Sequence, residues 1–195
     1  MYDNGSIKAI GTATQEITLK GVNASSGYWR GVHIETNTFN KQLDYVNISD
    51  AGSNYVYCCN EVATIFLKGG KLSIKNSSLS NGGGVGIYAN GAAEMREFES
   101  NEITSHTSYP LSLDVERVTE LDGTGSDFSG NTEDYAFIFK SDVDKPTTLK
   151  KINIPYLVDN NAVINVKEGL TVEAGAEMAF SENGGLGVYD NGFFK

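Results

Sequence analysis

The stretch of sequence that decides the fold begins with Leu79-Ser80-Asn81-Gly82-Gly83-Gly84-Val85-Gly86-Ile87. The same pattern returns 24 residues later as Ile103-Thr104-Ser105, and it again leads into an alternating segment, Leu111-Ser112-Leu113. Apolar residues two positions apart place one set of side chains on each face of a β-strand. The stretch therefore predicts a repeated unit of short strands separated by polar turns.

The repeat extends along the chain as two rows of apolar residues with nearly the same period. The first row contains Ile48, Leu79, Ile103, Phe128, Leu157 and Phe180, with spacings of 31, 24, 25, 29 and 23 residues. The second row contains Ile34, Ile65, Ile87, Leu113, Ile138, Ile164 and Val188. A unit of about 25 residues is too short for a strand–helix–strand crossover, which needs about 30 residues or more. The period predicts an all-β parallel solenoid of about seven or eight stacked coils, with each row forming an interior ladder.

The alternative to a solenoid is an antiparallel β-sandwich, whose strands also alternate between apolar and polar residues. The dipeptides that favour tight hairpins occur in mid-chain only as Asn81-Gly82 and Asn90-Gly91. Because the repeat consists of whole units of about 25 residues, the sequence favours the solenoid over the sandwich.

Composition and charge narrow the function classes. The 195 residues are expected to form one domain, residues 1–195, and the formal net charge of −10 argues against binding to nucleic acid. No stretch of 18 apolar residues suggests a membrane span, and the polar start Met1-Tyr2-Asp3-Asn4-Gly5 does not resemble a signal peptide. The only cysteines are the adjacent Cys58 and Cys59, so neither a metal site nor a cofactor is predicted.

Five segments carry a resemblance to a known family. They are Gly5-Ser6-Ile7-Lys8-Ala9-Ile10-Gly11-Thr12, Glu16-Ile17-Thr18-Leu19, Gly27-Tyr28-Trp29-Arg30-Gly31-Val32, Leu43-Asp44-Tyr45-Val46-Asn47-Ile48 and Gly169-Leu170-Thr171-Val172-Glu173-Ala174-Gly175. With these segments the chain resembles the right-handed parallel β-helix repeat proteins of the pectate-lyase-like superfamily. The resemblance implies a right-handed β-helix and an exported or cell-surface setting. It says little about activity, because one fold carries many functions.

The two ends of the chain match each other. Tyr2-Asp3-Asn4-Gly5-Ser6-Ile7-Lys8 recurs as Tyr189-Asp190-Asn191-Gly192-Phe193-Phe194-Lys195, with five of seven positions identical at an offset of 187 residues. This match predicts one module of a longer tandem array. A solenoid whose ends are not capped exposes apolar side chains and unpaired strands, so we also expect end-to-end self-association.

The catalytic candidates come from the enzymes of the resembling superfamily, which carry acids, and in lyases a Lys or Arg base, on the outer face of adjacent coils. Asp114, Glu116 and Arg117 are the closest match in this sequence. If Asp114 and Glu116 lie two apart on one strand, they share a face and are about 7 Å apart. No row of acids repeats across three coils, so a solvated face of mixed charge is the competing interpretation.

The ligand-binding candidates are aromatic. Tyr28, Trp29 and Arg30 could contact a sugar ring, although an aromatic residue at this place in the resembling modules points to packing. The 31-residue first interval predicts an inserted loop, and Tyr55 and Tyr57 in that loop are the second candidates.

The sequence leaves two functions open, and as a third possibility a cytoplasmic protein of unknown role whose Met1 is natural. The leading interpretation is a non-catalytic structural or binding module of a secreted or cell-surface protein, with polysaccharides or other glycans as partners. The alternative is a polysaccharide lyase or hydrolase of the pectate-lyase-like type. A row of outward acids beside a basic residue, inside a groove, would favour the enzyme.

Overall fold

The computed structural model describes residues 5–35, 41–54, 61–140, 142–159, 162–189 and 192–195. In these residues the fold is all-β, with one short 3₁₀ helix, η1 (Val115–Glu120). The strands are β1 (Ile7–Ile10), β2 (Ile17–Leu19), β3 (Val32–Ile34), β4 (Lys41–Asp44), β5 (Val46–Ser49), β6 (Ala63–Lys68), β7 (Lys71–Lys75), β8 (Ser78–Ser80), β9 (Val85–Asn90), β10 (Glu94–Glu99), β11 (Glu102–Thr104), β12 (Leu111–Asp114), β13 (Ala136–Lys140), β14 (Asp142–Val143), β15 (Thr147–Leu149), β16 (Tyr156–Val158), β17 (Val163–Val166), β18 (Gly169–Val172), β19 (Met178–Phe180), β20 (Gly185–Val188) and β21 (Phe193–Phe194).

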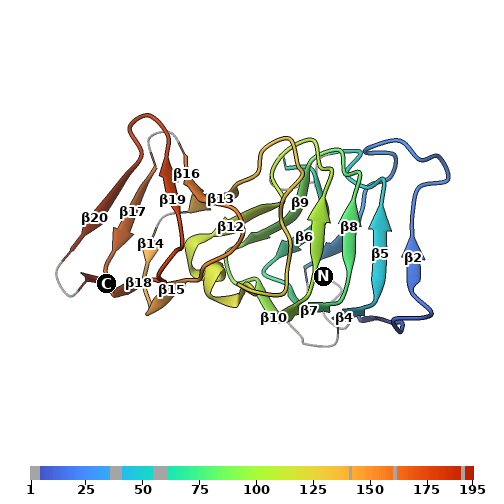
Figure 1. Ribbon diagram of the computed structural model, residues 1–195, viewed down its shortest axis with the longest axis horizontal. Coiled ribbons are helices and arrows are strands. Elements are labelled where there is room, and N and C mark those ends of the chain that lie inside the picture. Colours follow the sequence, from blue (N-terminus) through green and yellow to red (C-terminus); the bar gives the residue numbers. More distant parts are fainter. Residues whose placement is uncertain (1–4, 36–40, 55–60, 141, 160–161, 190–191) are drawn as a thin grey trace.

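Every pairing between these strands is parallel, as the repeat predicts, and the antiparallel sandwich is excluded for the described residues. The longest sheet has seven strands in the order β19-β16-β13-β12-β9-β6-β3. Four-stranded sheets β1-β4-β7-β10 and β11-β8-β5-β2 and three-stranded sheets β14-β17-β20 and β15-β18-β21 form the other walls. Figure 1 shows the strands side by side along the long axis, from β2 at one end to β20 at the other. This arrangement is consistent with a β-solenoid.

The first interior row is confirmed over its N-terminal part. Ile48 pairs in register with Leu79, and Leu79 pairs with Ile103. All three side chains are almost completely buried. The row begins one strand earlier than predicted, because Leu19 of β2 pairs with Ile48.

The same row is wrong beyond Phe128. Leu157 lies in the seven-stranded sheet, where it pairs with Phe137 and Ala179, and its side chain is only partly buried. The neighbouring Val158 is the buried residue and pairs with Ile138 and Phe180. A short apolar segment followed by polar residues looks alike on every wall of a coil, so the local pattern could not assign β16 to its sheet.

The second predicted row is also in register only in part. Ile65 pairs with Ile87, and Leu113 pairs with Ile138, as the row predicts. Ile34, however, pairs with Leu67, two residues beyond Ile65. The last two members of the row, Ile164 and Val188, belong to the separate sheet β14-β17-β20, where they pair with Leu186 and Val166.

The bends between walls are made by residues in the left-handed backbone region. Tyr45, Asn76 and Ser100 have φ of 53°, 49° and 52°, and each lies between a strand of the β1-β4-β7-β10 sheet and the next strand along the chain. A second set with positive φ follows the next wall and contains Asp50, Asn81, Ser105 and Gly130. Asn and Asp tolerate this conformation better than most side chains, which explains their frequency in the turns.

One column of apolar side chains fills the space between the walls over most of the chain. The buried polar pair Thr64 and His106 is hydrogen-bonded: Thr64 Oγ1 and His106 Nε2 are 3.0 Å apart, and Asn131 Oδ1 accepts from the His106 backbone N–H at 3.0 Å. A Cβ at Gly82 would collide with the His106 ring, so that glycine is required for the close approach. No helix in the described part of the chain is long and apolar enough to cross a membrane.

Candidate functional site

The structure separates the two acids that the sequence places on one strand. β12 ends at Asp114, and Glu116 is in η1. Asp114 is 2% exposed and caps η1, because its Oδ1 accepts from the Glu116 backbone N–H at 3.2 Å. The expectation of an outward Asp114–Glu116 pair on one strand is therefore wrong. Val115 and Val118, three residues apart and both buried, are the sequence signal for a 3₁₀ turn at this place.

The helix η1 packs against β10 and β15. Thr119 Oγ1 accepts from the backbone N–H of Thr148 at 3.0 Å, which ties η1 to β15. On the other side, Glu120 Oε2 accepts from the backbone N–H of Met95 in β10 at 2.7 Å. Side chains of η1 therefore satisfy backbone groups that a neighbouring strand would otherwise pair, and η1 takes a strand's place in this wall.

Arg117 of η1 is buried, with 4% of its surface exposed. Its Nη1 donates to the Ala93 carbonyl at 2.6 Å and to Glu120 Oε1 at 2.7 Å, and its Nη2 lies 3.7 Å from Glu116 Oε2. The buried Nε has no hydrogen-bond partner. The guanidinium thus holds η1 against β10 and its preceding turn.

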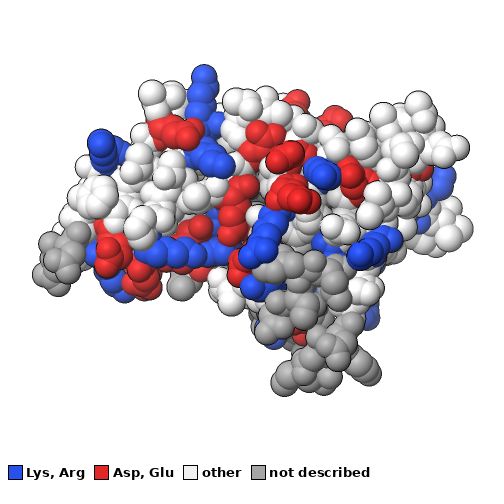
Figure 2. Space-filling view, turned by 90° about the horizontal axis from the view of Figure 1, so that it is seen from below, with Lys and Arg blue, Asp and Glu red and all other residues white. Residues whose placement is uncertain are grey.

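A polar hollow of about 490 Å³ opens beside Arg117. Its lining consists of Gly91, Ala92, Glu94, Glu116, Arg117, Glu120 and Lys145. Figure 2 shows Lys and Arg side chains interspersed with Asp and Glu over the middle of the molecule seen from below. The structure thus brings Glu116 and Arg117 together with three charged residues that the sequence did not single out.

Each acid that lines the hollow is paired with a cation of the protein. Glu94 lies 2.7 Å from Lys71 Nζ and 3.7 Å from Arg96, and Glu116 lies 3.3 Å from Lys145 Nζ. The hydrogen bond from Lys71 holds the pKa of Glu94 below its usual value. Burial raises the pKa of Glu120, against the opposing hydrogen bond from Met95 and the charge of Arg117.

This pairing occupies part of the hydrogen-bonding capacity of the hollow. Both oxygens of Glu120 accept hydrogen bonds from N–H donors, although burial outweighs these bonds and raises the pKa of Glu120. The Arg117 guanidinium is bound by two carboxylates and by the Ala93 carbonyl. The arrangement offers a polar ligand several hydrogen-bonding groups.

Of the two described aromatic candidates, Trp29 is packed against the core and Tyr28 is exposed. Trp29 packs against the interior column, and its indole N–H donates to the Ser49 carbonyl at 2.7 Å. Tyr28 is 48% exposed, and Arg30 is also exposed. Tyr55 and Tyr57 lie outside the described residues, as do Cys58 and Cys59.

A row of rings on the outer face of the seven-stranded sheet was not foreseen from the sequence. Phe66 stacks on Tyr88 with ring centroids 4.8 Å apart, and Tyr88 stacks on Phe139 at 4.9 Å. Tyr109 and Phe137 form a further stacked pair at 4.8 Å, and both are partly buried. Because the ring faces pack against each other, these residues stabilise the sheet and leave few faces free for a sugar.

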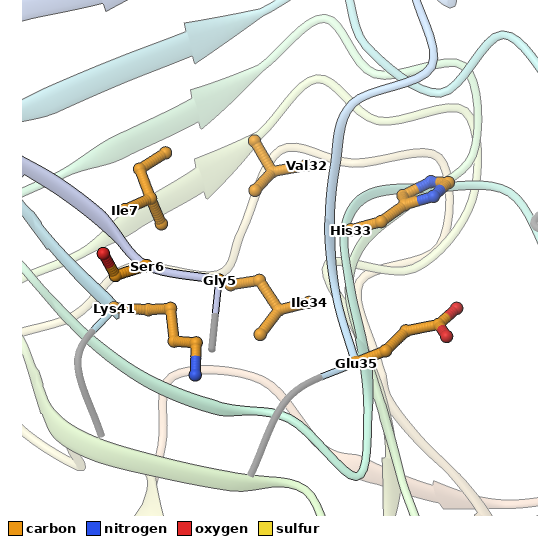
Figure 3. Close-up of a pocket in the computed structure, with 8 residues that line it drawn as sticks. All are labelled: Gly5, Ser6, Ile7, Val32, His33, Ile34, Glu35 and Lys41. Atoms are coloured by element: carbon orange, nitrogen blue, oxygen red, sulfur yellow. The ribbon is translucent and has the colours of Figure 1, made fainter. Parts of the chain in front are cut away.

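A second, mainly apolar hollow of about 240 Å³ lies at the N-terminal end of the interior column. Figure 3 shows Ile7, Val32 and Ile34 grouped around it, with His33 and Glu35 directed away on the other side of β3. These apolar residues belong to β1 and β3, the first strands of their sheets. Among the described residues, no further strand pairs beyond β1 or β3 at this end of the column.

No group of His, Cys, Asp and Glu that could hold a metal ion occurs among the described residues. Asp142 of β14 and Asp144, which follows that strand, lie 3.4 and 3.1 Å from Lys167 Nζ. No family model, curated protein or solved structure matches this chain.

Proposed function

We propose that the chain is a non-catalytic structural and binding module of a secreted or cell-surface protein, built as a right-handed parallel β-helix of seven or eight coils. The resemblance to the pectate-lyase-like superfamily supports this setting and handedness. The hollow beside η1 is the glycan contact of the module. The observation that carries the proposal is that every acid lining this hollow is paired with a cation or a backbone N–H of the protein.

The lining of the hollow suits sugar hydroxyl groups. A hydroxyl both donates and accepts, and each carboxylate retains accepting capacity beyond its protein partner. The side chains of Glu94 and Lys145 are 33% and 53% exposed, so a ligand can reach them. The net charge of −10 favours a neutral glycan over an acidic one.

Lys145→Ala is expected to weaken binding of neutral glycans about fivefold, because it removes a donor from the rim of the hollow. Binding is measured on an array of neutral and uronate oligosaccharides, with titration calorimetry on the best neutral ligand. Lys20→Ala is the matched control, because Lys20 is exposed in the turn after β2 and does not line the hollow. Equal affinities for the two variants, or no glycan bound by the unmodified chain, would contradict the assignment.

The enzyme alternative has a separate readout. Incubation with acidic and neutral polysaccharides is expected to give neither new reducing ends nor unsaturated products. Turnover that is lost in both Glu116→Gln and Glu120→Gln, with binding retained, would replace the binding module by a polysaccharide lyase or hydrolase.

A further inference from the structure

A further hollow, of about 230 Å³, lies on the outer face of the sheet β11-β8-β5-β2. It shares no lining residue with the hollow beside η1. Figure 1 shows β2, β5 and β8 side by side at the front of the view. The lining comes from just before β2, from the starts of β5, β8 and β11, and from the bends that precede these three strands. The hollow therefore crosses the strands of the sheet rather than following one of them.

One column of the lining consists of outward polar side chains in register. Each member comes one residue before an almost completely buried apolar residue of its strand, so its own side chain lies on the outer face. The members are Asn47, Ser78 and Glu102. Because neighbouring strands are about 4.8 Å apart, the column presents an amide, a hydroxyl and a carboxylate at that spacing.

A second column is formed by the bend residues two positions earlier. The members are Tyr45, Asn76 and Ser100, all with positive φ and all in the lining. Their bends are stacked, since Tyr45 donates its backbone N–H to the Lys75 carbonyl at 3.3 Å and Asn76 donates to the Glu99 carbonyl at 2.9 Å. The two columns together make an array of side chains over three successive strands.

Tyr45 is the exceptional member of this array. A bulky aromatic residue seldom adopts a φ of 53°, whereas Asn tolerates this conformation at the equivalent bend. The ring is partly exposed, and it stacks on no other ring in the described part of the chain. Residues in unfavourable backbone conformations are concentrated at binding sites. The ring thus lies beside the polar column with part of its surface open to a ligand.

The charge of this hollow differs from that of the hollow beside η1. Its described lining contains two acids, Glu16 and Glu102, and no Lys or Arg. Both acids are exposed, and neither forms an ion pair within the described residues. Glu16 Oε2 accepts from Asn47 Nδ2 at 2.6 Å, which positions its carboxylate. A ligand that supplies positive charge therefore complements the site.

We propose that this hollow binds a glycan unit that carries a protonated amine, an amino sugar, within a chain that crosses β5, β8 and β11. The apolar face of the sugar ring lies on Tyr45, and its hydroxyl groups bond to Asn47 and Ser78. Its ammonium group is attracted by the carboxylates of Glu16 and Glu102. A simple amine would use the carboxylates alone, whereas an amino sugar also uses the aromatic ring and the polar column. The assignment does not depend on the hollow beside η1.

Two matched ligands test the charge preference. A tetramer of glucosamine and the same tetramer with every amine acetylated are titrated into the unmodified chain by calorimetry. At about pH 6, where the free amine is protonated, the glucosamine tetramer is expected to bind about fivefold more tightly. Raising the salt to about 0.5 M is expected to remove most of this preference, because the carboxylates are exposed.

Two variants test the site itself. Tyr45→Asn removes the ring but places at this bend the residue that Asn76 provides at the next one, so the fold is expected to be retained. It is expected to weaken binding of the glucosamine tetramer about fivefold. Glu102→Gln is expected to lower the preference for the free amine to about twofold. Glu182→Gln is the control, because it makes the same change in charge at an exposed residue outside the hollow. Circular dichroism verifies each fold.

The outcomes separate this site from the hollow beside η1. If Lys145→Ala leaves glycan binding unchanged, the contact beside η1 fails and the site at Tyr45 is unaffected. Equal binding of the two tetramers, or binding of the glucosamine tetramer that is unchanged in both Tyr45→Asn and Glu102→Gln, would overturn the site at Tyr45. Spermidine, which has the charge without the sugar, is expected to bind more weakly. Equally tight binding of spermidine would overturn the assignment to an amino sugar.

Discussion

Leu79→Ala is expected to lower the free energy of unfolding by about 3–4 kcal/mol. Leu79 is completely buried and lies in register between Ile48 of β5 and Ile103 of β11, so truncation leaves a cavity bounded by a strand on each side. Both of these strands are fixed by backbone hydrogen bonds to β8 and cannot collapse into the space. Urea unfolding followed by circular dichroism measures the loss.

Leu157→Ala is the matched control for this substitution. The sequence pattern places Leu157 in the same interior ladder as Leu79, but the structure turns it to the outer face of the seven-stranded sheet, partly exposed. Its truncation is expected to cost about 1 kcal/mol, because only part of the side chain leaves a packed surface. A cost equal to that of Leu79→Ala would show that the sheet assignment of β16 is wrong.

Acidification is expected to destabilise the protein through His106. The ring is 2% exposed, and burial lowers its pKa from 6.5 to about 4, against the opposing hydrogen bonds from Asn131 and Thr104. The folded state therefore keeps His106 neutral at a pH where the unfolded chain binds a proton. Its contribution is fully present above about pH 6.5 and is lost as the pH falls towards 4, a change of about 3 kcal/mol.

The measurement compares urea unfolding at pH 7.5 and pH 4.5 for the unmodified chain and for His106→Gln. Carboxylates such as Glu94, whose pKa is lowered by Lys71, also lose stability in acid, but they do so in both proteins and cancel in the difference. The unmodified chain is expected to lose about 2.5 kcal/mol more than the variant between these pH values. Parallel losses would rule out His106 as the titrating group.

Some of the residues that line the hollow could be predicted from the sequence, and others could not. Glu116 and Arg117 were singled out because the resembling enzymes carry acids beside a basic residue. Glu94 lies about one coil earlier and Lys145 one coil later, so only stacking brings them to Arg117. The role of Asp114 was misjudged because the alternation of β12 was extended through it, whereas the chain turns into η1 at that residue.

The predicted interior rows are wrong at a strand whose local sequence does not show which side chains point inward. β16 consists of Tyr156, Leu157 and Val158, three residues that could each point inward. The choice is made by pairing with Ile138 and by Tyr156 Oη, which donates to the Lys150 carbonyl at 2.8 Å. The local sequence of β16 predicts neither of these contacts.

The sequence by itself determined that the chain is built from short strands and polar bends repeated about every 25 residues. The reason is that alternation and turn chemistry are properties of neighbouring residues. Only the tertiary structure decided which wall each strand joins, where η1 interrupts a wall, and which charges meet around Arg117. Those outcomes depend on register between coils, and shifting one strand by a single residue exchanges its inner and outer faces.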